Sequence, residues 1–224
     1  ISSFIFLLSL LLSLTLLVAP GQTQSERGSL QILEADAHHL LLELTLPTFE
    51  SQTVTHDGKT YQRLHVAKWG YWGTAGQPQL PMHSLLLGMP GLGHPQITVV
   101  EAERQVVKDY IVYPAAALER GDTPEAPVVE SFTLDAQIYK SDAVYPGPLV
   151  QAADIGLLRD QPVFQLRLYP FQYNPRRQEL HIYHRLKVRV SFPDAALPLN
   201  AKDTQTPAVF EHILEQTVLN YDAR

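Results

Sequence analysis

Apolar and polar residues alternate along most of the chain after residue 30. Leucines stand at every second position from 40 to 46, which is the period of a half-buried strand. Ser51–Thr55 and Thr60–Ala67 flank an Asp-Gly pair, a dipeptide typical of hairpin turns. The same pattern predicts further strands at 82–89, 96–101, 105–113 and 137–139. The chain is therefore predicted to be all-β.

The clearest pair of strands is predicted between residues 162 and 192. Apolar residues at alternate positions from 164 to 168 would share one face of the first strand, and Asn174-Pro175 would form the turn. In the second strand, 180–192, apolar residues alternate with basic ones, so that one face is apolar and the other basic. The basic face has two interpretations: a solvated sheet surface, or a docking surface for an acidic partner.

Two segments depart from the strand pattern. Residues 114–131 contain three prolines and show no apolar period, which favours an exposed loop. Within 207–219, apolar residues recur at helical spacing behind a capping threonine and a proline. This arrangement predicts one short amphipathic helix.

The first nineteen residues carry no charge and consist mainly of Leu, Ile, Phe and Val. Such a run is typical of the apolar part of a secretory signal peptide, and a retained membrane anchor is the alternative. Ala19-Pro20-Gly21 supplies small residues for a signal peptidase, and no positively charged segment precedes the run. We therefore expect a signal peptide over 1–21, truncated at its start, and a polar linker over 22–29. The rest is expected to be secreted and to contact no membrane once the signal is cleaved.

The composition narrows the class of protein. Hydrophobic residues make up 45% and charged residues 18%, as in a globular domain. Seventeen Lys and Arg against 23 Asp and Glu give a net charge of −6, which argues against a nucleic-acid partner. The chain has no cysteine, which excludes disulfides, thiolate zinc sites and a cysteine nucleophile within it.

None of the candidate residues forms a recognisable catalytic or metal-binding motif in the sequence. His38 and His39 are neighbours on a predicted strand, so they would face opposite sides and could not converge on one ion. His181 and His184 are interpreted in the same way. Gly88–Gly93 lacks the Lys-Ser/Thr of a phosphate loop, so a surface turn is predicted. We expect no catalytic residue, no metal and no cofactor.

An aromatic patch formed by Trp69, Tyr71 and Trp72 leaves a second function open. Exposed aromatic rings can stack on sugars, as in an extracellular binding module, whereas the edge of a buried core would serve only packing. Both interpretations fit the sequence.

Arg120 stands alone in the predicted loop, after Glu119 and before Gly121 and Asp122. The segment is either a plain loop or a means of presenting Arg120 to a pocket specific for basic side chains.

Four short motifs follow one another along the chain. They are, in order, Gly76-x-Pro78-x-Leu80-Pro81; Tyr145-Pro146-Gly147; Leu158 to Tyr183, with Tyr173-Asn174-Pro175 inside it; and Leu219 to Arg224. In this order and spacing they resemble the pro-domain that precedes gingipain-type (family C25) cysteine peptidases. The resemblance covers about residues 30–224, and the segment 114–140 matches least.

The resemblance implies a fold and a division of the chain. We expect an antiparallel, jelly-roll-like β-sandwich pro-domain over 30–206. A helix and processing segment over 207–224 would then lead to a catalytic domain that is absent here.

The resemblance also implies a function. The chain would act as intramolecular chaperone and latency inhibitor of a secreted cysteine endopeptidase, with the cognate catalytic domain as its partner in cis. Arg120 and its three neighbours form the candidate inhibitory loop. Arg224 is the candidate processing site, because peptidases of this family often cut after Arg or Lys. The alternative is a stand-alone extracellular β-sandwich for binding or adhesion.

Overall fold

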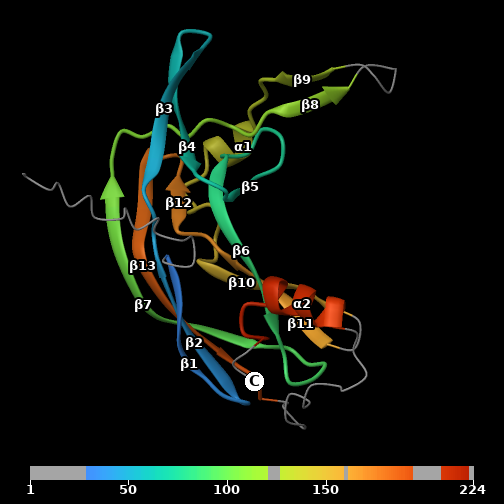
Figure 1. Ribbon diagram of the computed structural model, residues 1–224. Helices are drawn as coiled ribbons and strands as arrows, with labels where there is room; N and C mark the ends of the chain where they lie inside the picture. The colour runs from blue at the N-terminus through green and yellow to red at the C-terminus, as the bar shows by residue number, and fades with distance from the viewer. Residues whose placement is uncertain (1–28, 121–126, 159–160, 194–207, 222–224) are drawn as a thin grey trace, which may run out of the picture.

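Antiparallel sheets make up most of the computed structural model, which describes residues 29–120, 127–158, 161–193 and 208–221 (Figure 1). The larger sheet has five strands, in the order β1-β2-β13-β12, with β7 also paired to β13. Its strands are β1 (Leu30–Ala35), β2 (His39–Thr45), β7 (Gln96–Val107), β12 (Phe171–Asn174) and β13 (Glu179–Ser191). Because β7 pairs along nearly all of β13, the strands β12 and β2 share its other edge, one after the other.

A four-stranded sheet has the order β10-β11-β6-β5. Its strands are β5 (Gly70–Trp72), β6 (Leu80–Gly88), β10 (Val150–Leu158) and β11 (Gln161–Leu168). Two separate hairpins complete the strands: β3 (Phe49–His56) with β4 (Lys59–Val66), and β8 (Ala117–Arg120) with β9 (Val128–Ser131). The helices are α1 (Ala136–Tyr139) and α2 (Ala208–Thr217).

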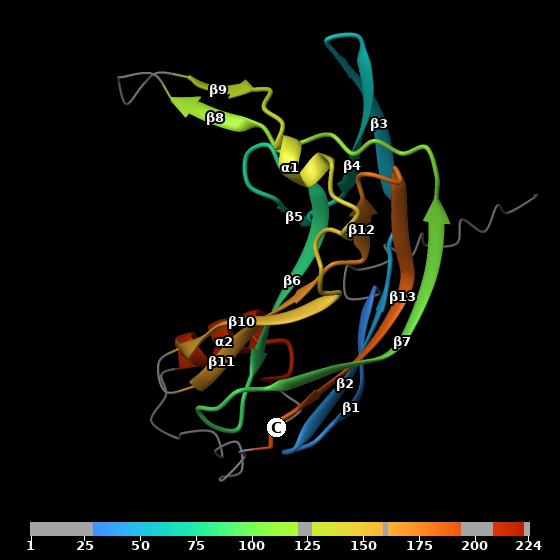
Figure 2. The same cartoon turned by 180° about the vertical axis from the view of Figure 1, so that it is seen from behind.

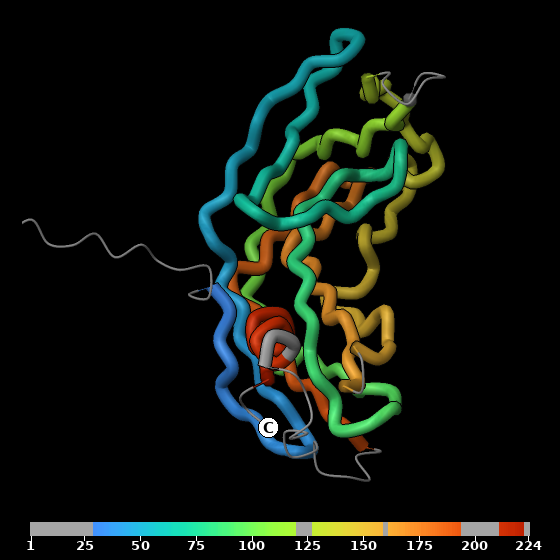
Figure 3. Tube along the Cα trace, turned by 45° about the vertical axis from the view of Figure 1, so that its right-hand side comes forward, coloured from blue at the N-terminus to red at the C-terminus, as the bar shows by residue number. Residues whose placement is uncertain are grey.

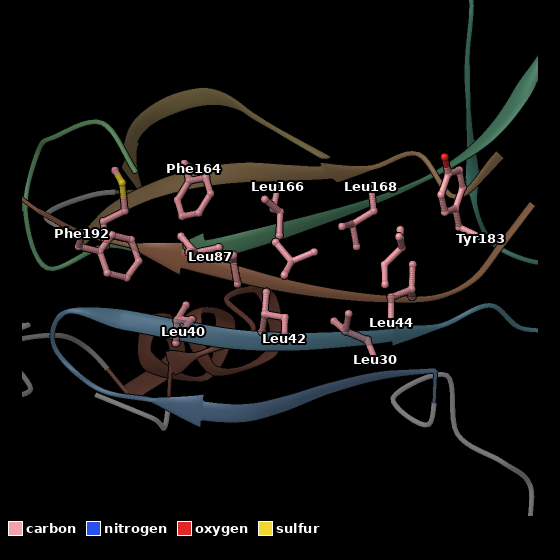
Figure 4. Packing of buried hydrophobic residues seen from close by; sticks show 14 residues of the cluster. Leu30, Leu40, Leu42, Leu44, Leu87, Phe164, Leu166, Leu168, Tyr183 and Phe192 are labelled. Carbon is pink, nitrogen blue, oxygen red and sulfur yellow. The ribbon is translucent and has the colours of Figure 1, made fainter. Parts of the chain in front are cut away.

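The main core lies between the two large sheets. Alternate leucines of β2, Leu40, Leu42 and Leu44, are buried in one cluster with Phe164 and Leu166 of β11 (Figure 4). Removing each such side chain from water stabilises the fold by roughly 1.5–3 kcal/mol. Two antiparallel sheets packed across a shared core make a β-sandwich, so the predicted all-β class is confirmed.

Several predicted elements are confirmed. Asp57 and Gly58 have positive φ angles of 48° and 73° at the turn of the β3–β4 hairpin, as expected for Asp-Gly. The helix predicted at 207–219 is α2. The predicted signal peptide and nearly all of the predicted linker lie outside the described residues. In the part of the chain that the structure does describe, no helix is long and apolar enough to cross a membrane.

The predicted pairing between 162 and 192 is wrong in its partner. β13 does turn back at Asn174-Pro175, but it pairs with β12, whereas β11 pairs with β10 and β6 of the other sheet. Pro170 separates β11 from β12, and proline cannot donate a ladder hydrogen bond. The chain therefore leaves one sheet and enters the other at this point.

Two other local predictions are also wrong. The strand predicted at 96–101 is confirmed as part of β7, but the separate strand predicted at 105–113 is wrong: β7 continues to Val107 because β13 pairs along its length. The strand predicted at 137–139 is helix α1. The side chain of Asp135 accepts hydrogen bonds from the amides of Gln137 and Ile138, which is the arrangement of a helix N-cap.

Candidate functional site: a projecting hairpin and its stem

The β8–β9 hairpin projects from one end of the molecule, where the tip of the β3–β4 hairpin also lies (Figures 1 and 3). The prediction of an exposed loop over 114–131 is therefore partly wrong, because Ala117–Arg120 pairs with Val128–Ser131. Large apolar side chains are exposed on both strands: Leu118 is 69% exposed and Val129 58%. Exposed apolar residues on a projecting hairpin are typical of contact surfaces.

Arg120 is the last residue of strand β8, opposite Val128. Its neighbour Glu119 accepts a hydrogen bond from the hydroxyl of Ser131, at 3.0 Å, across the hairpin. The side chain of Arg120 and all of Gly121 and Asp122 lie outside the described residues. The structure thus gives Arg120 an extended backbone at the end of a paired strand.

Gly76 holds both ends of the segment that carries the hairpin. Its amide donates to the carbonyl of Ala115 at 2.8 Å, and its carbonyl accepts from the amide of Asp135 at 2.9 Å. Gly76 has a φ of 86°, and a Cβ there would lie 3.0 Å from the amide nitrogen of Asp135. Glycine is required because no side chain fits this close backbone contact in a left-handed conformation.

The rest of the first motif continues this support. The amide of Ala115 donates to the carbonyl of Gln77 at 2.7 Å, and Pro78 forms a bridge with Pro114. Leu80 and Pro81, which begin β6, are buried. The motif therefore joins a strand of the sandwich to the two segments that flank the hairpin, residues 113–116 and 132–135, which we call its stem.

Aromatic side chains brace the stem against the β3–β4 hairpin. The ring of Phe132, just after β9, stacks on His56 with a centroid distance of 3.8 Å. It also contacts Tyr61 and Tyr113, at 5.6 and 5.7 Å. The guanidinium of Arg63 lies 4.3 Å from the centre of the Tyr113 ring, a distance suited to a cation–π contact. The base of the β8–β9 hairpin is thus fixed to the turn end of the β3–β4 hairpin, where His56 pairs with Lys59.

The Tyr173-Asn174-Pro175 motif binds the loop between α1 and β10, which contains Asp142 and Tyr145. The backbones of Tyr173 and Tyr145 exchange two hydrogen bonds, at 2.7 and 2.8 Å. The side chain of Asn174 donates to the carbonyl and carboxylate of Asp142 and accepts from the amide of Arg177. Pro175, like Tyr173, is buried.

Side chains connect this second motif to the first. The hydroxyl of Tyr145 donates to the side chain of Gln77 at 2.8 Å. Burial raises the pKa of Tyr145 and of Tyr173 to about 12 each, so both remain neutral donors at physiological pH. The hydrogen bonds of Arg177 and Asn174 hold the pKa of Asp142 below its usual range. The motif residues are consequently structural supports, and their contact joins segments too far apart in the sequence for a local pattern to indicate it.

The predicted basic face of β13 is compensated by its neighbours. Lys187 contacts Glu101 of β7 at 2.9 Å and Glu43 of β2 at 3.8 Å. Arg185 lies 3.4 Å from Glu101 and 3.7 Å from Glu103. The hydrogen bond from Lys187 lowers the pKa of Glu101. The face is therefore a mixed-charge sheet surface, which favours the solvated interpretation over an acidic docking partner.

The aromatic patch lies at the edge of the core. Trp69 is partly buried against both main clusters and stacks on His83 at 4.7 Å. Trp72 is partly buried and packs edge-on against Tyr169 at 5.3 Å. Tyr71 is more exposed, and its hydroxyl contacts the ring of His65. The two indoles are engaged in packing, which removes the main support for a sugar-binding platform.

The histidines singled out in the sequence do not converge. The ring of His39 lies between Glu34 and Asp36, while His181 is buried and His184 contacts Gln105. Within the described ranges, no group of three or more His, Asp or Glu is arranged to hold a metal ion.

Comparison with known proteins identifies similar chains. The Propeptide_C25 family model matches residues 27–224. Gingipain R2 of Porphyromonas gingivalis, from two strains, is 28% identical over 152 residues, which is 66% of this chain and 20% of gingipain R2. The chain thus spans about a fifth of the length of these curated relatives.

Two solved structures share the fold. The complex of Porphyromonas gingivalis RgpB pro- and mature domains matches with a TM-score of 0.73 and 23% identity, over 88% of this chain and 98% of that chain. A structure addressing the zymogenic latency of gingipain K from the same organism matches with a TM-score of 0.59 and 19% identity, over 73% of this chain and 91% of that chain.

Proposed function

This chain belongs to the Propeptide_C25 family, and from that premise we propose that it is the N-terminal pro-domain of a secreted, gingipain-like cysteine endopeptidase. In this role it assists folding of the catalytic domain and keeps that domain latent. The catalytic domain is its partner in cis and follows Arg224, where cleavage after a basic residue separates the two.

The main support for this proposal is the projecting β8–β9 hairpin. Its first strand ends at Arg120 and its stem is held by Gly76 and Ala115. An extended segment that ends in arginine resembles a peptide substrate, which binds by main-chain pairing and by side-chain pockets. The arginine cation would then occupy the pocket that recognises a basic residue before the cut.

The stem explains why a hairpin would inhibit better than a free peptide. Gly76, Pro78 and Phe132 order the base of the hairpin before it meets the peptidase. Binding then costs less conformational entropy, which is the general advantage of a preorganised ligand. The β8–β9 ladder would also keep both sides of a cut after Arg120 in place, so that cleavage would not release the hairpin.

A stable interface needs about 800 Å² from each partner, more than one short hairpin supplies. The tip of the β3–β4 hairpin lies at the same end of the molecule in both views (Figures 1 and 2). We therefore place the catalytic domain against this end, in contact with both hairpins.

Inhibition of the mature peptidase tests the proposal. The chain from residue 25 onward is titrated against the cognate mature enzyme, with a substrate that carries Arg or Lys before the cut. Inhibition below micromolar concentration is expected. Replacing Arg120 by Ala should weaken it by tens-fold or more, as for other residues that dominate an interface.

Arg189→Ala is the matched control, because Arg189 is an exposed arginine on β13 opposite the β1–β2 hairpin, at the other end of the molecule. Its inhibition constant should equal that of the unaltered chain. Equal constants for Arg120→Ala and Arg189→Ala would reject the role of Arg120. No inhibition by the unaltered, folded chain would reject the latency role itself.

A further inference from the structure

The last described residues of the chain are bound to the end of strand β6. The amide of Gly88 donates to the side-chain oxygen of Asn220 at 2.7 Å, and the side-chain nitrogen of Asn220 donates to the carbonyl of Gly88 at 3.1 Å. Asn220 is only 2% exposed. One side chain thus satisfies both backbone groups of a residue that is 132 positions away.

This pair of hydrogen bonds requires an amide. Asparagine offers one acceptor and two donors at a fixed spacing, whereas aspartate offers no donor when ionised, and leucine or alanine offers neither. Gly88, predicted to begin a surface turn, is instead buried. A Cβ at Gly88 would lie 3.3 Å from Val218 and 3.5 Å from the Asn220 oxygen, so a small residue is needed for this contact. We call the pair the Asn220–Gly88 clasp.

Packing on both sides strengthens the clasp. The amide of Leu219 donates to the carbonyl of Leu86 at 3.0 Å. Val218 and Tyr221 are buried in a cluster with Leu214 of α2 and Val163 of β11, and the hydroxyl of Tyr221 contacts Glu211. Helix α2 lies in the half of the molecule away from the two projecting hairpin tips (Figure 3).

We propose that the Asn220–Gly88 clasp controls cleavage after Arg224 by withholding the residues that a peptidase must bind before the cut. This inference rests on the proposed processing site. Tyr221 is 8% exposed, and Arg224 follows it by only three positions. Three residues reach at most about 11 Å even when fully extended.

A peptidase binds several residues before the cut in an extended form, with side chains entering successive pockets. The fourth residue before a cut after Arg224 is Tyr221, which is packed in the cluster. Cleavage must therefore proceed from a locally opened state, and its rate follows the population of that state when opening and closing are fast. The clasp makes Asn220 a positioning residue for processing.

Limited proteolysis of the precursor tests this inference. The precursor with its natural sequence after Arg224 is treated with trypsin, which cuts after Arg and Lys, and the products are followed by intact mass. Asn220→Ala should speed cleavage after Arg224 by about tenfold, because a lost buried hydrogen-bond pair shifts the opening equilibrium by at least that factor. Asn220→Asp should speed cleavage at least as much as Asn220→Ala, because its second carboxylate oxygen would face the buried Gly88 carbonyl, which is also an acceptor.

Two controls separate local opening from general destabilisation. Gln216→Ala alters an exposed residue of helix α2, which precedes Asn220, and should leave the rate unchanged. Arg176 and Arg177 lie in the exposed turn after β12, and cleavage there should keep its rate in every variant.

The proposal is overturned if cleavage after Arg224 is unchanged in Asn220→Ala while hydrogen exchange of the Gly88 amide is faster. It is also overturned if cleavage at every site accelerates together. The inhibition constants of the unaltered chain and of Arg120→Ala are measured separately and depend on neither result. Rejecting the role of the clasp therefore leaves the latency role to its own test.

Discussion

Replacing Gly76 by alanine tests whether the first motif supports the projecting hairpin. Gly76 joins both ends of the segment 115–135 through its own amide and carbonyl, with a φ of 86°. An alanine there must either keep the left-handed backbone or give up one of the two hydrogen bonds. Both outcomes loosen the stem that holds Arg120.

The structure sets the magnitude. A left-handed backbone costs a residue with a side chain about 1–2 kcal/mol. The new Cβ would lie 3.0 Å from the amide nitrogen of Asp135, and such overpacking costs about 1–3 kcal/mol. The lower entropy of alanine in the unfolded chain offsets about 0.4–1 kcal/mol. The net loss in free energy of unfolding is about 2–3 kcal/mol, which lowers the Tm of a domain of this size by about 4–12 °C.

Two glycines give matched controls. Gly147 has no positive φ, and no atom lies within 4 Å of the position that a Cβ would occupy, so Gly147→Ala should stay within about 0.5 kcal/mol of the unaltered chain. Gly58 has a φ of 73° and open space around it, so Gly58→Ala should show the backbone cost alone, about 1 kcal/mol.

Thermal unfolding and hydrogen exchange are the assays. The amides of Ala115 and Asp135, which bond to the Gly76-Gln77 segment, should exchange faster in Gly76→Ala than in Gly58→Ala. Inhibition of the peptidase should weaken in parallel. A Gly76→Ala protein with the Tm of Gly147→Ala and unchanged exchange at Ala115 would refute the supporting role of the motif.

Two further predictions concern the sandwich itself. Burial lowers the pKa of His181 below the ordinary value of 6.5. As pH falls below 6.5, the unfolded chain is therefore protonated first, and the free energy of unfolding decreases toward the folded pKa. Denaturant unfolding at pH 7 and pH 5 should show a smaller decrease for His181→Gln than for the unaltered chain, and an equal decrease would contradict the lowered pKa of His181. Leu42→Ala should cost about 2–5 kcal/mol because it opens a cavity in the main core, whereas Leu33→Ala, at a residue that is 43% exposed, should cost well under 1 kcal/mol by the same unfolding measurement. Similar losses for both leucines would contradict the placement of the core.

The sequence predicts the sandwich where one local pattern decides the structure. Alternate leucines in β2 and the Asp-Gly turn of β3–β4 each require only neighbours along the chain, and both are found as expected. The helix α2 is likewise predicted from its own spacing of apolar residues. In each case the burial of one face and the turn chemistry agree.

Elements that depend on distant partners could not be predicted in this way. The β8–β9 pairing has no apolar period, because apolar side chains of both its strands are exposed, and α1 depends on one capping aspartate, Asp135. The face of β13 that is basic in the sequence is a mixed-charge surface in the fold, because Glu43 of β2 and Glu101 of β7 lie beside Lys187. A pattern along one strand carries no information on which strands will lie beside it.

The supporting residues of the site were recognised as motifs without their physical role. Gly76 signals a special backbone conformation, but only the structure shows that Ala115 and Asp135 are its partners. In the same way, Asn220 is visible in the last motif, and its bond to Gly88 is not. Arg120 remains a prediction, because its side chain lies outside the described residues.

Reading the coding sequence beyond Arg224 tests the central claim most directly. A pro-domain in cis predicts an open frame that continues into a peptidase domain with the histidine and cysteine of a C25 enzyme. The chain spans about 20% of the length of gingipain R2, so most of such a precursor would lie beyond it. A stop codon immediately after Arg224 would contradict a pro-domain acting in cis.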